Sequence, residues 1–522
     1  MKSFSATELS QHSTEESAFI AIEGRVFDLT SFLDGHPGGK RVLLPLLGRD
    51  ATDAFKLYHS ILPTLSKYKH LIIGVLEGSS QSESDENLSS LSEPFGNLVA
   101  FTEPAWYSGQ PTPYYNDSHR RLRVWIRKLV DEHIVPFVHD WEAAGEVPRD
   151  LYETFGKEGV LSCMIGVSPW PSWVPHKPPC NIASEEWNTF HEVVLGDELA
   201  RCASVGAAAT LTLGPQIALP CIINYGTDAM KSKIIPSVLC GEKTICLCIT
   251  EPSTGSDVAN IQSSAVLSKD GSHYIVNGEK KWITNGVWAD YFIVAVRTGK
   301  DGMNGISLIL LERGMDGLRT RKITCQGNTG SGTAFVIMEN VKVPKENIIG
   351  KENKGFMCIM KNFNHERFGL IIGAIRSARI CYEDAILHAN RRKTFGQTLF
   401  EHGVIRNKLA NMAWRIEAAQ AWMESLTFQM TQMSPEEATF KLGGATALLK
   451  AQCSQTLEYC AREASQILGG LSYTKGAGVG GRIERIYRDV RGVAIPGGSE
   501  EIMLDLGIRQ SVKVSQVMGA KF

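Results

Sequence analysis

Two histidines in the first part of the chain have the type and surroundings that an iron ligand requires. His36 lies in the tight turn His36-Pro37-Gly38-Gly39, and His59 follows after a helical stretch with apolar residues that can line a pocket. Neutral imidazoles on two facing elements can ligate an iron from both sides, and His is a common haem ligand. Because most single histidines are surface or core residues, the pair alone is weak evidence for such a site.

Four short segments of the remaining chain combine hydroxyls, glycines, an aromatic ring and a cation. Residues 250–257 (TEPSTGSD) end a strand in a turn that can bind a pyrophosphate or a flavin edge through hydrogen bonds. Trp282 closes a hairpin where its ring can shield a bound ring. The guanidinium of Arg392 lies close in sequence to an aromatic residue, and its paired N–H groups can bind a phosphate. Residues 466–470 (QILGG) form a helix end and a turn. Each segment alone is more typical of an ordinary cap or hairpin.

The elements that position these residues follow from composition and hydrophobic period. Residues 78–93 (GSSQSESDENLSSLSE) have too little apolar surface to fold, so they predict a flexible linker. Residues 1–77 before it predict a small module of short strands and short helices. Residues 94–242 have a helical period, residues 243–350 alternate as β-strands do, and residues 351–522 return to long helices. The predicted order is a module, a linker, helices, a β domain and helices.

Composition limits the classes of function. The chain has 522 residues, 43% of them hydrophobic and 21% charged, which is typical of a soluble globular protein. The 54 Lys and Arg nearly balance the 56 Asp and Glu, so nucleic acid is not expected as the main partner. No apolar run reaches the ~18 residues of a membrane span. The 12 cysteines contain no CxxC pair, so we expect reduced thiols without a bound metal.

Both ends of the chain bear on its location. The N-terminal residues lack the apolar core of a signal peptide and the Arg-rich character of a transit peptide. The last four residues, 519–522 (GAKF), depart from a Ser-Lys-Leu type of peroxisomal signal. These features predict a cytoplasmic protein, with mitochondria and peroxisomes as the alternatives.

Residues 4–77 resemble a cytochrome b5 domain. The resemblance rests on the turn at His36, on Gly48, Asp50, Ala51, Thr52 and Phe55, and on His59 with the serine after it. It implies a small α+β domain that binds haem b through His36 and His59, with both axial positions filled and electron transfer as its chemistry. The alternative is a similar fold that has lost haem and serves as an interaction module.

The order and spacing of the four later segments resemble the acyl-CoA dehydrogenase family over residues ~115–515. The resemblance implies an α-helical domain, a β-barrel domain and a C-terminal four-helix bundle, with FAD as cofactor. Thr250 and Ser256 would contact the flavin, and Trp282 and Thr284 would cover it, with Thr284 near N5. A second group would hold the diphosphate and adenosine of a neighbouring subunit's FAD: Arg392, Phe395, Gln466, Gly469 and Gly470. A shared site implies at least a dimer, and a homotetramer is usual in the family.

The family needs one carboxylate as a base, and two positions compete for it. Counting from Arg488 places Gly497, which has no side chain, at the commoner position. Long-chain and isovaleryl-type relatives carry the base on a helix, directly before an arginine, and Glu366 and Arg367 stand there. The resemblance therefore predicts Glu366 as the base, with Arg367 supporting its position and charge. Glu500 and the residue after it are the fallback bases.

The resemblance predicts α,β-dehydrogenation of an acyl-CoA thioester. Glu366 takes the α proton, N5 of FAD takes the β hydride, and the N–H of Gly497 points at the thioester oxygen. Phe363 and Asn364 would contact the pantetheine arm. The electrons are expected to pass to the fused haem, with an electron-transferring flavoprotein or a reductase as the external alternative.

Two other functions remain open on the same scaffold. One is a flavin oxidase or desaturase acting on a non-CoA or carrier-bound substrate; oxidases of the nitroalkane type use Asp as base, so Glu366 disfavours them. The other is a flavin-bearing binding protein without enzymatic activity, which the near-neutral charge and the available base disfavour.

Overall fold

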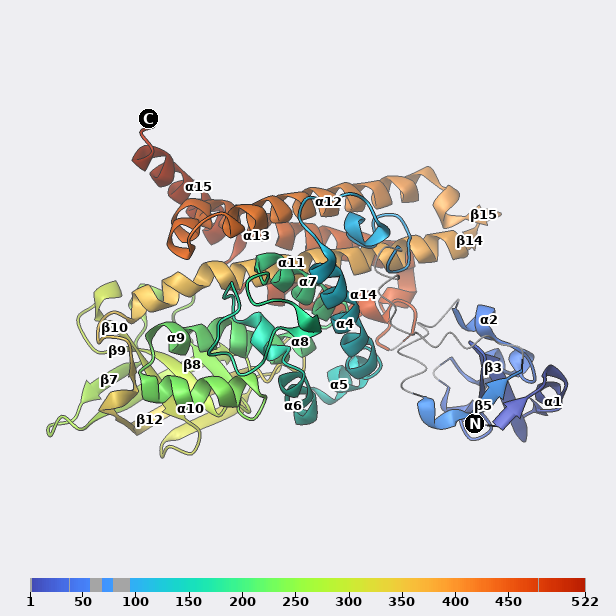
Figure 1. The fold of residues 1–522 in the computed structure, drawn as a ribbon, viewed down its shortest axis with the longest axis horizontal. Coiled ribbons are helices and arrows are strands. Elements are labelled where there is room, and N and C mark those ends of the chain that lie inside the picture. Colours follow the sequence, from blue (N-terminus) through green and yellow to red (C-terminus); the bar gives the residue numbers. More distant parts are fainter. Residues whose placement is uncertain (1, 37, 57–67, 78–93, 477, 522) are drawn as a thin grey trace.

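A computed structural model describes residues 2–36, 38–56, 68–77, 94–476 and 478–521 (Figure 1). His59 and the linker predicted at 78–93 lie outside the described residues.

The N-terminal module contains a five-stranded sheet in the order β1-β5-β4-β3-β2. Apolar residues of β3 and β4, among them Ile20 and Phe27, pack with Leu33 and Leu47 in one buried cluster. The strands and helices of the module are β1 (Lys2–Phe4), α1 (Ala6–Ser10), β2 (Ser13–Thr14), β3 (Ser17–Ile22), β4 (Arg25–Asp28), α2 (Thr52–Lys56) and β5 (Ile72–Leu76). This is the mixture of short strands and helices that the sequence predicts.

A helical domain follows. Two of its helices begin at matching caps, because Asn116 and Asn188 each bond the third residue of their helix, His119 and His191, through side chain and backbone. The two imidazole rings stack at 3.9 Å between centroids. The helices are α4 (Asp117–His133), α5 (Val138–Ala144), α6 (Arg149–Lys157), α7 (Thr189–Ala200), α8 (Val205–Leu213), α9 (Leu219–Tyr225) and α10 (Asp228–Leu239).

One continuous helical stretch among the described residues, Val205–Tyr225, has the length and hydropathy of a membrane span, although the sequence alone suggested no such run. It comprises α8, one π-helical turn at Gly214–Ala218, and α9. However, 72% of its apolar window is buried inside the protein. Its apolar character therefore serves core packing.

The middle domain is an eight-stranded, mainly antiparallel sheet. Its strands pair in the order β11-β12-β8-β7-β9-β10-β13, and β6 pairs with β9. Its apolar face forms a separate core that includes Phe292 and Val336. The strands are β6 (Ile245–Cys248), β7 (Ser264–Leu267), β8 (His273–Ile283), β9 (Tyr291–Arg297), β10 (Ile306–Glu312), β11 (Leu318–Lys322), β12 (Ala334–Pro344) and β13 (Ile348–Ile349).

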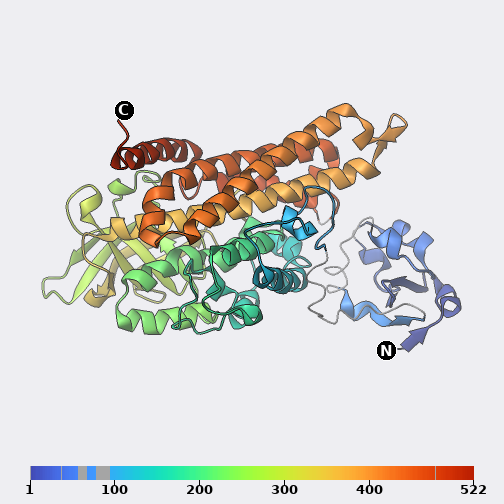
Figure 2. The same ribbon diagram turned by 45° about the horizontal axis from the view of Figure 1, so that its top comes forward.

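Long helices complete the fold. Figure 2 shows them (orange to red) lying along the helical domain and the sheet. A short hairpin joins α11 to α12 at one tip of the bundle (Figure 1). The elements are α11 (Gly355–Arg391), β14 (Lys393–Thr394), β15 (Gln397–Thr398), α12 (Gly403–Thr431), α13 (Pro435–Leu468), α14 (Gly481–Ala494) and α15 (Glu500–Val517). The predicted fold class is confirmed.

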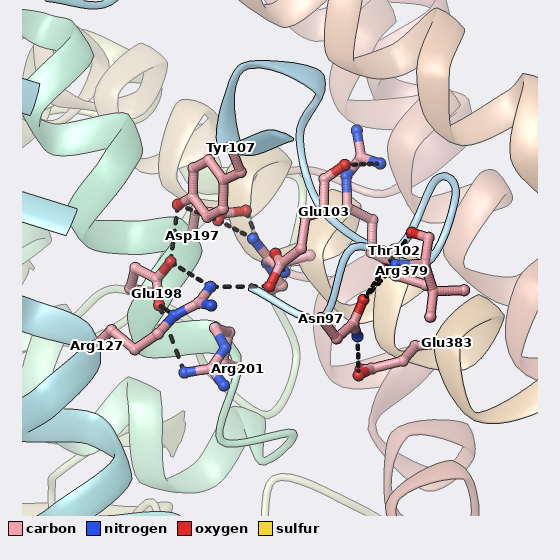
Figure 3. A network of polar contacts seen from close by, with 12 residues as sticks. Asn97, Thr102, Glu103, Tyr107, Arg127, Asp197, Glu198, Arg201, Arg379 and Glu383 are labelled. Carbon is pink, nitrogen blue, oxygen red and sulfur yellow. Dashed lines mark hydrogen bonds and ion pairs between the residues drawn. The ribbon is translucent and has the colours of Figure 1, made fainter. Parts of the chain in front are cut away.

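The segment directly after the linker is fixed by a buried ionic network (Figure 3). Glu103 accepts hydrogen bonds from Arg127 of α4 at 3.0 Å and from Arg376 of α11 at 2.6 Å. Arg127 also bonds Glu198 of α7, as does the hydroxyl of Tyr107 at 2.8 Å. Although burial opposes it, Arg376 and Arg127 lower the pKa of Glu103 to about 2. The network ties α4, α7 and α11 to the segment that leads from the linker.

Candidate active site

Glu366 lies on the first half of α11, close to the core. Its side chain keeps partial exposure, while Arg367 and Phe368 beside it are buried. Burial raises the pKa of Glu366, and the charges of Arg367, Lys450 and His365 oppose that rise. A carboxylate that is enclosed and still reachable, with a raised pKa, has the properties of a general base.

The turn between α14 and α15 lies against Glu366. Gly497 in this turn has φ +67°, a conformation that L side chains rarely adopt. The guanidinium of Arg367 donates from Nε to the carbonyl oxygen of Gly497 at 2.9 Å and from one Nη to Oδ1 of Asn364 at 3.0 Å. Arg367 therefore joins the helix that carries the carboxylate to the turn that carries the commoner base position. Sequence reasoning named these residues, and the structure brings them together.

The fallback bases have structural roles of their own at the start of α15. Oε1 of Glu500 accepts a hydrogen bond from Ser454 at 2.9 Å. Glu501 is exposed, and hydrogen bonds from its own backbone and from Ser499 lower its pKa. Acidic residues in the first turn of a helix complement its dipole. These features favour Glu366 over both.

The residues predicted to cover a flavin lie around the ends of β6 and β8. Thr250 follows β6, and its carbonyl accepts the backbone N–H of Lys281 at 2.9 Å, which joins the two strand ends. Trp282 has φ +61° and is 50% exposed, although its neighbours in β8 pair within the sheet. Thr284 is half-buried and Ser256 is exposed. Nζ of Lys281 lies 4.4 Å from the centroid of the Trp282 ring, and the indole is still half-exposed. An exposed aromatic ring on a strand end with Thr284 two residues further along can pack on a flat ring with polar edges, so these residues fit FAD.

The residues predicted for the diphosphate and adenosine lie elsewhere in the chain. Arg392 and Phe395 belong to the β14–β15 hairpin at the tip of the bundle, well away from β8 in both views (Figures 1 and 2). The Phe395 ring is 97% exposed at φ +51°. Gln466, Gly469 and Gly470 are exposed at the end of α13. One chain therefore does not bring the two predicted groups together, as expected if they serve flavins of different subunits.

The predicted substrate residues Phe363 and Asn364 lie shortly before the predicted base on α11. Phe363 is partly buried against the core of the helical domain, and the guanidinium of Arg367 lies 5.5 Å from its ring centroid. Asn364 donates from Nδ2 to the backbone carbonyl of Thr439 at 3.4 Å. Both residues thus lie on the turn of helix that precedes Glu366.

The proposed haem ligand His36 is half-buried at the end of a short 3-10 turn. Its Nδ1 lies 3.3 Å from the carbonyl oxygen of Gly39, a contact that assigns the proton to Nδ1 and ligation to Nε2. A Cβ at Gly38 would lie 3.0 Å from Cε1 of His36, so a larger residue at this position would crowd the imidazole. The ring centroids of Phe32 and His36 lie 6.1 Å apart, and both Phe32 and Phe55 pack against the apolar core of the module. The described half of the site fits haem; His59 lies outside the described residues.

Sequence reasoning missed a polar cluster behind the base. His365 bonds Glu192 of α7 through Nε2 at 2.6 Å and the carbonyl of Gln216 through Nδ1 at 3.1 Å. Although burial opposes it, the carboxylate of Glu192 raises the pKa of His365. Gln216 belongs to the π-helical turn, a form that is frequent at functional sites. The only sequence signal was the short run Asn362–Glu366, which does not indicate its partners on α7 and the π turn.

A buried asparagine joins this region to the flavin hairpin. Asn285 is 1% exposed at φ +63°, and its Nδ2 donates to the carbonyl of Thr210 at 3.2 Å. Thr210 lies in α8 of the helical domain. The hairpin that carries Trp282 is thereby fixed to the helical domain.

Comparisons with known proteins agree with this arrangement. Family models match the chain for the cytochrome b5-like haem/steroid binding domain at residues 5–77 and for the acyl-CoA dehydrogenase N-terminal, middle and C-terminal domains at residues 116–168, 246–341 and 353–512.

Individual relatives match most of the chain. The acyl-CoA dehydrogenase AFT10-1 of Alternaria alternata is 41% identical over 80% of this chain and 97% of its own length. The acyl-CoA dehydrogenase apdG of Emericella nidulans is 40% identical over 80% of this chain and 96% of its own. The crystal structure of an acyl-CoA dehydrogenase from Geobacillus kaustophilus has a TM-score of 0.67 at 30% identity, covering 77% of this chain and 99% of that one. The chain therefore belongs to the acyl-CoA dehydrogenase family and is an FAD-dependent oxidoreductase that also carries a cytochrome b5-like haem-binding domain.

Proposed function

We propose that the protein desaturates an acyl-CoA thioester between its α and β carbons, with Glu366 as the base. The main support for this proposal is the position of the Glu366 carboxylate. It lies on α11 against the Gly497 turn, and burial raises its pKa. A raised pKa strengthens the base toward a weakly acidic carbon.

The turn supplies the second part of the reaction. With the carbonyl of Gly497 held by Arg367, the backbone of this residue has a fixed direction. We propose that its N–H donates to the thioester oxygen, where negative charge develops as the α proton leaves. Phe363 and Asn364, one helical turn before the base, contact the pantetheine arm. Arg367 also keeps a positive charge beside Glu366, which favours its ionised form.

The cofactors supply the redox chemistry. When bound, FAD accepts two electrons from the substrate and haem carries one electron at a time. Thr250, Ser256, Trp282 and Thr284 hold the flavin ring of one subunit. A partner copy contributes its hairpin and its α13 end to the other half of that cofactor, so we propose at least a dimer and, as is usual in the family, a homotetramer.

The haem of the fused N-terminal module is the electron acceptor that we favour. The matches to the two fungal relatives account for nearly all of their length but for only four fifths of this chain, so the module is an addition to the dehydrogenase. A carrier on the same chain has a high effective concentration without a strong docking surface. We propose that electrons from the acyl group reach this haem, and that a separate electron-transferring flavoprotein or reductase is the alternative partner.

Anaerobic mixing with a panel of acyl-CoA thioesters tests the function. Bleaching of the flavin absorbance, with formation of the 2-enoyl thioester detected by mass spectrometry, is the expected result. Bleaching by carrier-bound acyl groups or by nitroalkanes alone would favour the oxidase or desaturase. A panel that leaves the flavin oxidised would favour a binding protein.

A further inference from the structure

Lys450 is a buried cation for which neither the sequence nor the mechanism above has given a role. It lies near the middle of α13 and is 2% exposed. Its Nζ donates to the carbonyl oxygens of Ala494 at 2.6 Å and of Gly498 at 2.8 Å. A buried lysine needs such partners, because an unpaired ammonium in the interior is costly. Ala494 ends α14, directly before the turn that carries Gly497, and Gly498 belongs to that turn.

The geometry of the turn depends on two cations. Ala494 is the last residue of α14, and its carbonyl is one of those that a helix end leaves without an internal partner. Lys450 satisfies it, while Arg367 holds the carbonyl of Gly497. Gly498 has φ +105° and Gly497 has φ +67°, so both glycines have wide backbone freedom when unrestrained. Pro496 restricts the start of the turn, and the two cations hold the part that the adjacent glycines leave free.

Lys450 also acts electrostatically on the base. Glu366 and Glu500 raise the pKa of Lys450, but burial, which is the largest effect, brings it down to about 8. In return, the charges that oppose the raised pKa of Glu366 are those of Arg367, Lys450 and His365. His365 is already paired with Glu192. Lys450 thus contributes a positive charge from α13 to a carboxylate on α11.

We propose that Lys450 is a positioning residue of the active site: it clamps the backbone of the Gly497 turn and keeps a cation facing the Glu366 carboxylate. The inference rests on the proposed role of Glu366. It assigns to α13 a part in proton abstraction although no atom of Lys450 touches the substrate.

The test replaces Lys450 and a matched lysine on the same helix. Lys450→Met keeps the length of the side chain and removes its charge and hydrogen bonds. Lys441→Met is the control, because Lys441 is exposed and pairs only with Glu437 of its own helix. Hydrogen exchange, followed by mass spectrometry of a peptide spanning residues 494–499, reports on the turn without any substrate. We expect at least ~10-fold faster exchange in Lys450→Met and no change in Lys441→Met.

The pH profile of flavin reduction reports on the charge. Loss of the cation favours protonated Glu366, so its apparent pKa should rise by about one unit in Lys450→Met. Lys450→Arg keeps the charge and should retain the wild-type apparent pKa. Unchanged exchange and an unchanged profile in Lys450→Met would overturn the proposal.

A third measurement needs no variant, in case Lys450→Met does not fold. Because the pKa of Lys450 is about 8, protection of residues 494–499 in the wild-type protein should fall between pH 7 and pH 9.5, after correction for intrinsic exchange. Constant protection over this range would overturn the part of the proposal in which the charge of Lys450 helps to hold the turn. If the wild-type protein reduces no acyl-CoA, the proposed function fails, but exchange still decides whether Lys450 holds the turn.

Discussion

A Cβ atom at Gly497 would lie 3.8 Å from Oε1 of Glu366. Gly497 lies in the turn between α14 and α15, and Glu366 lies on α11. A side chain at residue 497 would nevertheless begin close to the carboxylate of Glu366. We therefore propose that one site admits a base from either α11 or the turn. On this proposal, a glycine at residue 497 goes with a glutamate at residue 366 because both positions border the same space.

Replacing Glu366 with glutamine should abolish reduction of the flavin by substrate. The amide has nearly the same shape but does not accept the α proton, so we expect a loss of at least ~100-fold in the single-turnover rate. The measurement is anaerobic stopped-flow absorbance at saturating substrate. Glu501→Gln, which changes an exposed residue of α15, serves as the control. A near-normal rate in Glu366→Gln would remove Glu366 from the mechanism.

The pH dependence of the same rate follows from the raised pKa of Glu366. The base acts in its ionised form, so the rate should increase with pH until the carboxylate is fully ionised. Because burial raises the pKa, the midpoint should lie above 4.5, the ordinary value for a glutamate. A rate that falls with rising pH across this region would contradict the assignment.

Adding a carboxylate at residue 497 should restore part of the activity. We expect the double variant with Glu366→Gln and Gly497→Glu to be faster than Glu366→Gln alone, because both side chains reach the same space. Full recovery is not expected: a Cβ at Gly497 would lie 2.8 Å from Cδ1 of Leu370, and φ +67° strains any L side chain. Gly497→Gln in the same background is the control without a base. Equal rates in the two double variants would show that the positions do not share a target.

The haem prediction concerns His36 and His59. Either change to alanine removes one axial ligand, so the six-coordinate low-spin absorption spectrum should become high-spin, or haem should be lost. His70→Ala is a suitable control, since this histidine is exposed in the same module. A low-spin spectrum that survives either ligand change would mean that the ligands are wrongly assigned.

Electron transfer to the haem should occur within one assembly. After anaerobic mixing with acyl-CoA, we expect flavin absorbance to fall first and haem reduction to follow at a rate that does not depend on protein concentration. A linker of the 16 residues 78–93 spans on average ~20–24 Å if it behaves as a flexible chain. Fully bleached flavin with the haem still oxidised would rule out this route and favour an external acceptor.

Glu103 should contribute to stability at neutral pH. Its pKa of about 2 in the folded protein lies below the ordinary 4.5, so its contribution is present above pH 4.5 and is lost as the pH falls toward 2. A difference of this size corresponds to about 3 kcal/mol. Glu103→Gln should therefore lower the melting temperature at pH 7 and do so much less near pH 3. The exposed Glu437→Gln is the control; an equal loss at both pH values would contradict the linkage.

The sequence by itself determined the order of the domains and the identity of the chemistry. Three of these features are local: the β-period around Thr250, the helical period around Glu366 and the turn at His36. Each depends only on residues within a few positions of one another in the sequence. The absence of a carboxylate at Gly497 was likewise readable from the chain. Together with the family resemblance, these features predicted a base on one helix and flavin contacts on the sheet.

Only the tertiary structure decided what surrounds the base. Lys450 is separated from Gly498 by the end of α13 and the whole of α14, and Glu192 is far from His365 along the chain. No local sequence pattern indicates that Lys450 or Glu192 is buried. A charged residue in a helical sequence is expected to be exposed to solvent. Burial and partners arise when helices pack, and pKa shifts follow from both. Sequence therefore named Glu366, the proposed base, and packing determined the charges that surround it.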